Sequence, residues 1–341
     1  MRQAASLGLV LALIAAAAAA PVALAQDKPE LSKVRLAVGG KPALFYLPLT
    51  VTERRGLFRE QGLEVEISDF PGGARALQAL MGGSADVVTG SFDHTIQMQA
   101  KNQPVVGVVQ LGRFPGYVLG VLAGKSYAAP KDLKGMKIGI TAPGSSTHFM
   151  AQYVMVRNGL KRDDASFVGV GASASAVAAA KRGEIDAIVN VDPVIAVLES
   201  QNLIRIVADT RSESGTREIF GGPYPAAALY AQPAFVAKNP RTLQALANAF
   251  VRGLQWMQSH SAEEIAAVMP EEYALGDKAL YIQSIKNSLP MYSPDGRFSR
   301  EGAETAAKVL KEFDAEVGNA RIDVAATYTD AFVEKALAGR R

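Results

Sequence analysis

Residues 70–93 read FPGGARALQALMGGSADVVTGSFD, and this stretch decides the fold. A Pro-Gly-Gly turn precedes a short amphipathic segment, and a Gly-Gly break separates that segment from an apolar strand at residues 86–89. A turn of small residues, Gly90 and Ser91, then opens another helical segment. This order is typical of α/β proteins, in which ligands bind beyond the carboxyl ends of parallel strands and close to helix N-termini.

The same pattern returns about one hundred residues later. Residues 83–90, GSADVVTG, are echoed by residues 183–190, GEIDAIVN. Residues 71–74, PGGA, are echoed by 171–174, GASA, and the strands RLAV (35–38) and KIGI (137–140) are similarly spaced. A nearly constant spacing predicts two α/β lobes of similar plan. If the carboxyl ends of their sheets face each other, a cleft lies between them.

Strands and helices alternate along the chain, which predicts two mostly parallel sheets with flanking helices. We expect a discontinuous first lobe of residues 26–116 and 232–341, which includes a set of C-terminal helices. Residues 117–231 would form the second lobe, and the apolar runs 117–123 and 226–231 would carry the chain between the lobes. The polar, Gly-rich residues 209–225 are expected to be a solvent-facing segment.

The N-terminus predicts export. Met1 and Arg2 are followed by an apolar core at residues 7–20 and by a small-x-small site at residues 23–25. We therefore expect residues 1–25 to be a signal peptide cleaved before Gln26, with an N-terminal membrane anchor as the alternative. The chain has no cysteine, which excludes disulfides, thiolate metal sites and a lipid-modified cysteine at the mature terminus. An exported protein without a lipid anchor is expected in the periplasm of a double-membraned bacterium.

Signals for catalysis are missing from the sequence. The three histidines, His94, His148 and His260, have no metal-binding spacing, and there is no Gly-x-Ser-x-Gly elbow, phosphate loop or full dinucleotide fingerprint. A formal net charge of +3 without a basic stripe gives no case for nucleic acid. We therefore expect a binding protein with no catalytic residue, metal or cofactor.

Small-residue turns before predicted helices are the best candidates for ligand binding. Gly73 lets the backbone approach a ligand closely because glycine has no Cβ. Ser145, Ser146 and Thr147 place hydroxyls beside the free N–H groups of a helix start, which favour an anion. The serines could instead only cap their helix.

Other candidates follow strand ends or supply aromatic walls. Ser91 and Phe92 follow one strand, and Asn190 and Asp192 occupy the equivalent place in the second lobe, where Asp192 could instead cap a helix. Phe45 and Tyr46, with Phe92, could wall an apolar or aromatic part of a ligand, or Phe45 could belong to the core. Further groups near the predicted cleft could contact an anion or remain solvated, and these are Lys41, Arg75, Arg113 and His148.

Several motifs together resemble a known family. They are GGKPALFYLPL (39–49), ERRGLFREQGL (53–63), GGARALQAL (72–80), DLKGMKIG (132–139), GSST (144–147) and GEIDA (183–187). With the export signal, they resemble the nitrate/sulfonate/taurine type of ABC-transporter substrate-binding proteins. Binders of a thiamin pyrimidine precursor are similar to the same group. The resemblance covers essentially the whole mature chain.

The resemblance implies a bilobed type II periplasmic-binding fold with a two-strand hinge. It also implies a monomer that closes on a small ligand and delivers it to a membrane permease and its ATPase. The family's ligand positions fall on Phe45, Tyr46, Gly73, Ser91, Phe92, Ser145, Ser146, Thr147, Asn190 and Asp192. The chain lacks the cysteine-rich motif of the related yeast-type pyrimidine synthases, so we do not expect that activity here.

These observations predict capture of a small organic anion, a sulfonate or carboxylate with or without an aromatic part. An enzyme on the same scaffold, such as a small-acid dehydratase or lyase, is the first alternative, with Asn190, Asp192 or His148 as acid or base. A sensory protein that presents its ligand to a membrane receptor is the second.

Overall fold

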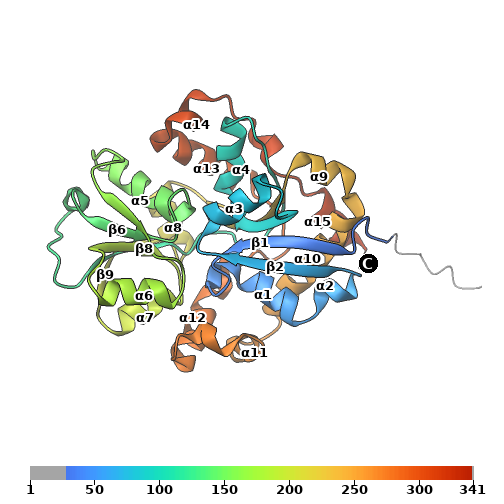
Figure 1. Cartoon of the computed structure of the whole chain (residues 1–341), viewed down its shortest axis with the longest axis horizontal. Helices are drawn as coiled ribbons and strands as arrows, with labels where there is room; N and C mark the ends of the chain where they lie inside the picture. Colours follow the sequence, from blue (N-terminus) through green and yellow to red (C-terminus); the bar gives the residue numbers. More distant parts are fainter. Residues whose placement is uncertain (1–27, 340–341) are drawn as a thin grey trace, which may run out of the picture.

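The computed structural model describes residues 28–339, so the predicted signal peptide lies outside the described residues. Two five-stranded sheets lie side by side, and helices cover their faces (Figure 1). We call each sheet with its covering helices a lobe, and the first lobe contains the first strand of the chain. The bilobed α/β architecture predicted from the sequence is confirmed.

The two sheets have the same topology. In the first lobe the spatial order is β2 (Glu64–Phe70), β1 (Lys33–Gly39), β3 (Val87–Ser91), β10 (Ala227–Ala231) and β4 (Val106–Gln110). In the second lobe it is β7 (Ser166–Gly169), β6 (Lys137–Ile140), β8 (Ala187–Asn190), β5 (Val118–Leu122) and β9 (Ile204–Asp209). One strand of each sheet, β10 or β5, pairs antiparallel with both of its neighbours. The sheets are therefore mostly parallel, as expected.

Equivalent aspartates fix the repeated strand pairs in register. Asp86 accepts hydrogen bonds from the backbone N–H of Arg35 (2.9 Å) and from its guanidinium group. Asp186, at the equivalent position of the second lobe, accepts one from the backbone N–H of Lys137 (2.8 Å) and pairs with Lys125. Each carboxylate therefore satisfies a backbone donor near the start of a neighbouring strand.

The chain passes between the lobes just before β5 and β10, rather than through them. The apolar runs 117–123 and 226–231 largely form these two strands, and each strand pairs within a single sheet. The passages are residues 111–117, the first connection, and residues 210–226, the second connection. They run side by side, because the Gly116 N–H donates to the Thr210 carbonyl (3.1 Å) and the Thr210 N–H donates to the Tyr117 carbonyl (2.9 Å).

Residues 209–225, which the sequence predicts to face solvent, are only partly exposed and include a helix. They contain α8 (Glu213–Phe220), whose first turn is capped by the Ser212 hydroxyl and which ends at Gly221 in the left-handed conformation. A serine cap and a glycine stop are ordinary helix boundaries, and they are present in the sequence.

The remaining helices cover the sheets. The first lobe has α1 (Leu47–Arg54), α2 (Leu57–Glu60), α3 (Gly73–Met81) and α4 (Asp93–Ala100), and the second has α5 (Ser146–Arg157), α6 (Ala174–Lys181) and α7 (Val194–Ser200). Helix α8 belongs to the second connection. Short 3-10 turns are η1 (Leu44–Tyr46), η2 (Pro130–Leu133), η3 (Glu271–Ala274), η4 (Leu289–Met291) and η5 (Val324–Thr327).

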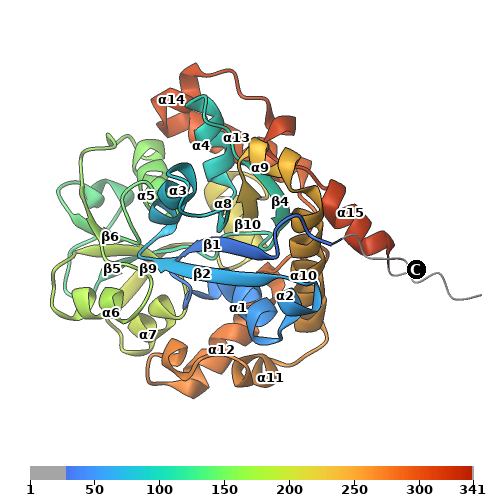
Figure 2. The same ribbon diagram turned by 45° about the vertical axis from the view of Figure 1, so that its right-hand side comes forward.

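The C-terminal part of the chain is helical. It contains α9 (Pro233–Lys238), α10 (Pro240–Gln258), α11 (Ala262–Ala267), α12 (Lys278–Ser288), α13 (Arg300–Phe313), α14 (Ala315–Asn319) and α15 (Ala331–Ala338). Helix α10 packs on α1, α2, α15 and β4 of the first lobe (Figure 2). Helix α13 contacts α4 of the first lobe, α5 of the second lobe and α8 of the second connection, and α12 contacts α7 of the second lobe. The C-terminal helices therefore cover the first lobe as expected, but α12 and α13 also join it to the second.

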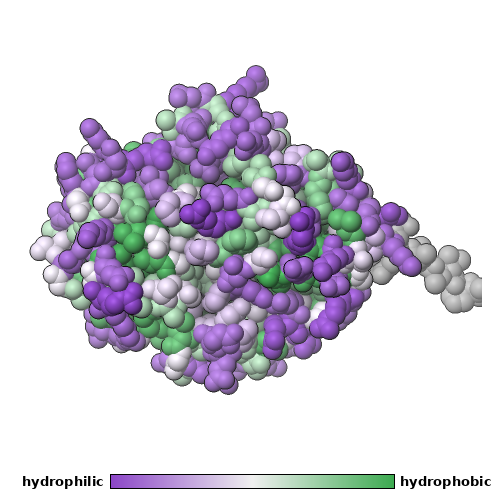
Figure 3. Space-filling view, viewed as in Figure 1, coloured by the Kyte–Doolittle hydropathy of each residue, from purple (hydrophilic) through white to green (hydrophobic). Residues whose placement is uncertain are grey.

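Apolar side chains fill the interior, and polar residues cover most of the face shown in Figure 3. Among the described residues, Leu31 is the one large hydrophobic side chain that is exposed. None of the described helices combines the length and apolarity needed to cross a membrane. The free energy of folding therefore comes mainly from apolar burial between each sheet and the helices that cover its faces.

Candidate functional site

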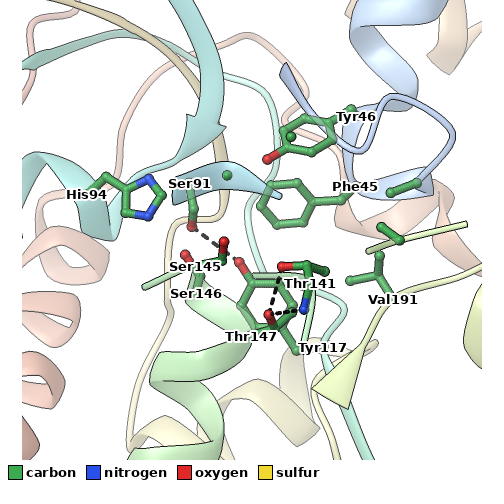
Figure 4. A pocket seen from close by; sticks show the side chains of 14 residues that line it. Phe45, Tyr46, Ser91, His94, Tyr117, Thr141, Ser145, Ser146, Thr147 and Val191 are labelled. Carbon is green, nitrogen blue, oxygen red and sulfur yellow. Dashed lines mark hydrogen bonds between the residues drawn. The ribbon is translucent and has the colours of Figure 1, made fainter. Parts of the chain in front are cut away.

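A small cavity lies between the two lobes. Its volume is about 30 Å³, which holds about two water molecules. The lining residues come from both lobes and from the first connection (Figure 4). They are Gly39, Ala43, Phe45, Tyr46, Gly73, Ser91, His94, Tyr117, Thr141, Ser145, Ser146, Thr147, Ala172 and Val191. An organic ligand of more than a few heavy atoms therefore requires the lobes to move apart.

Aromatic rings form one wall of the cavity. Phe45 and Tyr46 lie on η1, where their ring centroids are 4.8 Å apart in an edge-to-face arrangement. The Phe45 ring also stacks on Tyr117 of the first connection, at 5.6 Å between centroids. Burial raises the pKa values of the Tyr46 and Tyr117 phenols, so both remain protonated donors at neutral pH. The Tyr46 hydroxyl points into the cavity (Figure 4).

Two glycines bring the backbone of β1 against the start of α3. A Cβ on Gly39 would lie 2.2 Å from the Gly73 nitrogen, closer than any real contact. A Cβ on Gly73 would lie 3.2 Å from the His94 ring. The Gly-Gly turn is therefore needed because the end of β1, the N-terminus of α3 and the His94 ring occupy one small volume.

The opposite wall belongs to the turn that opens α5 in the second lobe. Thr147 holds this turn against the end of β6, because its hydroxyl oxygen accepts a hydrogen bond from the backbone N–H of Thr141 (3.1 Å). Ser145 is the N-cap residue of α5 but makes no capping bond with its side chain. Its hydroxyl oxygen instead accepts a hydrogen bond from the backbone N–H of Ala74, at 3.0 Å across the cleft.

The N-termini of α3 and α5 meet at this hydrogen bond. The backbone N–H groups of Gly73, Ser146 and Thr147 have no hydrogen-bond partner within residues 28–339. Such groups carry partial positive charge at a helix start. The cavity is therefore lined by unpaired donors from two lobes, an arrangement that suits a carboxylate, a sulfonate or another compact acceptor group.

His94 is neutral and held in one tautomer. Its Nε2 lies 3.4 Å from the Gly144 carbonyl oxygen, which can only accept, so Nε2 carries the proton. Its Nδ1 then accepts a hydrogen bond from the Tyr230 hydroxyl at 3.3 Å. Burial lowers the pKa of His94, which excludes a cationic ring at neutral pH.

Seven of the ten predicted ligand-binding residues line the cavity, and contact of each with a ligand remains a prediction. The seven are Phe45, Tyr46, Gly73, Ser91, Ser145, Ser146 and Thr147. Phe92 packs on Phe298 and Tyr328 inside the first lobe, because it is the N-cap residue of α4 and points to the core. The side-chain amide of Asn190 donates a hydrogen bond to the Gly171 carbonyl and accepts one from the Val191 N–H, and this residue does not line the cavity.

The charged candidates also lie away from the cavity. Lys41 pairs with Glu53 at 2.7 Å, Arg75 donates to Gln78, and Arg113 donates to the Pro290 carbonyl. His148 accepts a hydrogen bond from the backbone N–H of Gly144, and burial lowers its pKa to about 4. No Lys or Arg side chain is among the described residues that line the cavity.

Asp192 faces Arg211 rather than the cavity. Its carboxylate accepts a hydrogen bond from the Ala196 N–H (2.9 Å) and lies 3.8 Å from the Arg211 guanidinium. Its backbone carbonyl accepts from the Leu44 N–H across the cleft (2.8 Å). Burial raises the pKa of this carboxyl to about 6, although Arg211 acts in the opposite direction.

The pKa of Asp192 predicts a pH-dependent stability. Between about pH 4 and 6 the folded protein holds a proton that the unfolded chain has lost, so stability falls as pH rises through this window. An Asp192→Asn variant keeps the acceptor for Ala196 without the charge. We expect it to be more stable than the wild type by about 2 to 3 kcal/mol above pH 6. Denaturant unfolding should show the two proteins converging below about pH 4, whereas a pH-independent difference would contradict the assignment.

The sequence did not identify three important residues of the site. The sequence places Tyr117 in an apolar run between the lobes, offers His94 only as a metal ligand without the required spacing, and gives no role to Asp93. A signal existed for Asp93 and His94, because two polar residues follow the strand end at Ser91 and open a helix.

Comparison with known proteins identifies the family and the fold of this chain. A family model described as "NMT1/THI5 like" matches residues 46–264. The chain is 48% identical to a solved protein from Bordetella bronchiseptica RB50, with a TM-score of 0.89 and coverage of 92% of this chain and 99% of that one. It is 22% identical over 300 residues to the formylaminopyrimidine-binding protein of Halalkalibacterium halodurans, covering 85% of this chain and 87% of that protein.

A more distant structure shows the same fold. The alkanesulfonate-binding protein SsuA from Xanthomonas axonopodis pv. citri, solved with MOPS bound, aligns with a TM-score of 0.70 at 19% identity. The alignment covers 89% of this chain and 99% of that one. Two similar lobes, a cavity between them and a family model that covers most of the chain lead to one assignment: the protein belongs to the NMT1/THI5-like family and has the periplasmic-binding-protein fold.

Proposed function

We propose that this protein is the substrate-binding component of an ABC importer and that it captures a small organic anion between its lobes. The observation that carries the proposal is the meeting of two helix N-termini, α3 and α5, across the cavity with three backbone N–H groups unpaired among the described residues. The ligand would be delivered to a membrane permease and its ATPase. Export through residues 1–25 and a periplasmic location belong to the same proposal.

The closed arrangement of the lobes supports capture by closure. Hydrogen bonds cross the cleft between Ala74 and Ser145 and between Leu44 and Asp192. The two connections are paired through Gly116 and Thr210, so the lobes can rotate about a short two-segment hinge. Closure would exclude water from the ligand and so strengthen each hydrogen bond to it.

The ligand class follows from the lining. Backbone donors and hydroxyls bind an oxygen-rich acceptor group, and the Phe45, Tyr46 and Tyr117 rings contact an apolar or aromatic remainder. A carboxylate or sulfonate fits this set without a cationic side chain, because each helix N-terminus favours an anion by about 0.3 to 1 kcal/mol, and by more when partly buried. Micromolar affinity requires about 8 kcal/mol in total.

Calorimetry and thermal unfolding test the proposal. We expect a sulfonate or carboxylate to bind with micromolar affinity and to stabilise the protein by about 2.7 kcal/mol at one hundred times its Kd. Nitrate and formylaminopyrimidine are the comparison ligands, because a relative in the same family is named for the latter. A Tyr46→Phe variant should lose affinity, whereas Tyr281→Phe, whose hydroxyl is buried without a partner elsewhere, should not. If formylaminopyrimidine binds and none of the anions does, the proposed anionic ligand class is wrong and the ligand is neutral.

The enzyme alternative gains no support from the site. The candidate acids or bases are Asn190, Asp192 and His148. None of these residues lines the cavity, and each side chain has a hydrogen-bond partner elsewhere in the described residues. Mass spectrometry of a bound ligand before and after incubation should show no conversion, and turnover would contradict the transport proposal.

A further inference from the structure

A second, larger depression lies at the end of the first lobe away from the second lobe. It is bounded by the end of α2, the first half of α10 and by α15, which both views place at that end (Figure 1 and Figure 2). Its volume is about 770 Å³, far larger than that of the interlobe cavity. We call it the basic groove, and it shares no lining residue with the candidate ligand site.

The charges in the lining of the basic groove are mostly positive. Four lining residues are cations and one, Glu60, is a carboxylate that already pairs with an arginine of α10 outside the lining. Among the cations, Arg241 pairs with a glutamate at 3.0 Å. The other three, Lys28, Arg59 and Lys335, are exposed and form no ion pair within residues 28–339. Three positive charges without counter-charges around one groove favour an anionic partner.

A ladder of side-chain amides forms the floor of the basic groove. The Asn248 amide donates a hydrogen bond to Gln61 at 3.0 Å, and the Gln244 amide donates to Asn248 at 2.9 Å and to the Phe332 carbonyl at 2.8 Å. These bonds join the end of α2 to α10 and α10 to α15. The elements that carry the unpaired cations of α2 and α15 are therefore held at a fixed separation above a polar floor.

The chain that precedes Lys28 relates the basic groove to a membrane. Residues 7–20 are the apolar core of the predicted signal peptide, and residues 21–27 separate this core from Lys28. Seven residues span at most about 25 Å. While the apolar core occupies the membrane during export, Lys28 and the groove that it lines must therefore lie close to the lipid surface.

We infer that the basic groove docks on the phosphate groups of anionic lipids and holds the exported protein at the membrane that contains its permease. The inference rests on the proposed function for export and for the membrane partner. Each lysine or arginine near an anionic lipid surface strengthens attraction about fivefold, and salt screens this attraction. Without a cysteine the chain cannot carry a lipid anchor at its mature terminus, so charge is the means of retention that the described surface offers.

Cosedimentation of the full mature chain with lipid vesicles tests this inference. At about 50 mM salt we expect binding to phosphatidylcholine vesicles with about 30% phosphatidylglycerol to be at least about tenfold stronger than to pure phosphatidylcholine, and the preference to vanish at about 0.5 M. An Arg59→Gln, Lys335→Gln double variant removes two unpaired charges without breaking an ion pair of the described chain. Its binding to the anionic vesicles should be about 10- to 30-fold weaker.

A Lys131→Gln, Lys181→Gln double variant is the matched control. Both lysines are exposed in the second lobe, form no ion pair in the part of the chain that the structure describes, and change the net charge equally. We expect this control to lose less than about threefold in vesicle binding.

Three results would each overturn the inference: no preference of the wild type for anionic vesicles, unchanged binding of the groove variant, or an equal loss in the control. Binding of soluble glycerol phosphate without binding of vesicles would also overturn it. Calorimetry of the same preparations with sulfonates and carboxylates is independent of these results. A failure there overturns the proposed function, whereas a failure of vesicle binding overturns this inference alone.

Discussion

Oxidation of an Ala74→Cys, Gly144→Cys double variant is expected to lock the lobes together and abolish binding of added ligand. These residues face each other across the cleft, because a Cβ built on Gly144 lies 3.6 Å from the Cβ of Ala74. Disulfides require about 3.5 to 4.5 Å between these atoms. The chain contains no other cysteine to compete for the pairing. Since the closed cavity holds only about two waters, a ligand cannot enter without separation of the lobes.

Calorimetry before and after reduction measures this effect. We expect affinity to fall by at least about a hundredfold in the oxidised protein, which corresponds to about 2.7 kcal/mol, and to recover with dithiothreitol. The two single-cysteine variants are controls, and they account for the cost of a side chain at Gly144, which has φ +84°. Undiminished binding by the fully oxidised double variant would show that the ligand site does not lie in this interlobe cavity.

Replacement of Gly39 by alanine is expected to cause a large decrease in the free energy of unfolding. The added Cβ would lie 2.2 Å from the backbone carbon of Gly72 and the nitrogen of Gly73, and neither atom can rotate away. Either the end of β1 or the start of α3 must move, at a cost of about 3 kcal/mol or more. The same movement displaces the donor at Gly73, so ligand binding should weaken together with stability.

Gly62→Ala provides the control for this variant. Gly62 has φ +74° and nothing within 4 Å of the position of a Cβ, so only backbone strain is expected, at about 1 kcal/mol. Denaturant unfolding of both variants separates the clash from the general cost of replacing a glycine. A loss in Gly39→Ala no larger than that in Gly62→Ala would contradict the close approach of β1 and α3.

The repeat made the fold predictable from the sequence. Residues 83–90 and 183–190 are the same turn and strand in two sheets, and Asp86 and Asp186 make equivalent backbone bonds. Local chemistry also predicted the turn at residues 145–147, because small hydroxyl residues are preferred at helix starts. Within each lobe the pattern of apolar strands and glycine stops was therefore sufficient.

Features that depend on contacts between distant segments could not be predicted in this way. Phe92 has the same character as Phe45 but points into the core, because the N-cap of α4 fixes its direction. Asp93 acquires its hydrogen bond from the cavity-lining Ser146 only when α5 brings that residue to it from 53 positions away in the chain. Helices α13 and α14 are separate elements, because the Asp314 side chain accepts hydrogen bonds from the N–H groups of Glu316 and Val317 and so starts α14.

Helix α13 has a consequence for how such a molecule opens. The polypeptide passes from one lobe to the other twice, and two C-terminal helices add further contacts: α13 packs on α4 as well as on α5 and α8, and α12 packs on α7. When the lobes separate, the helices of the second lobe must therefore slide over α13, or α13 must move away from α4. We therefore expect changes in the packing of these C-terminal helices to alter how far the lobes separate, while the ligand-facing groups stay unchanged.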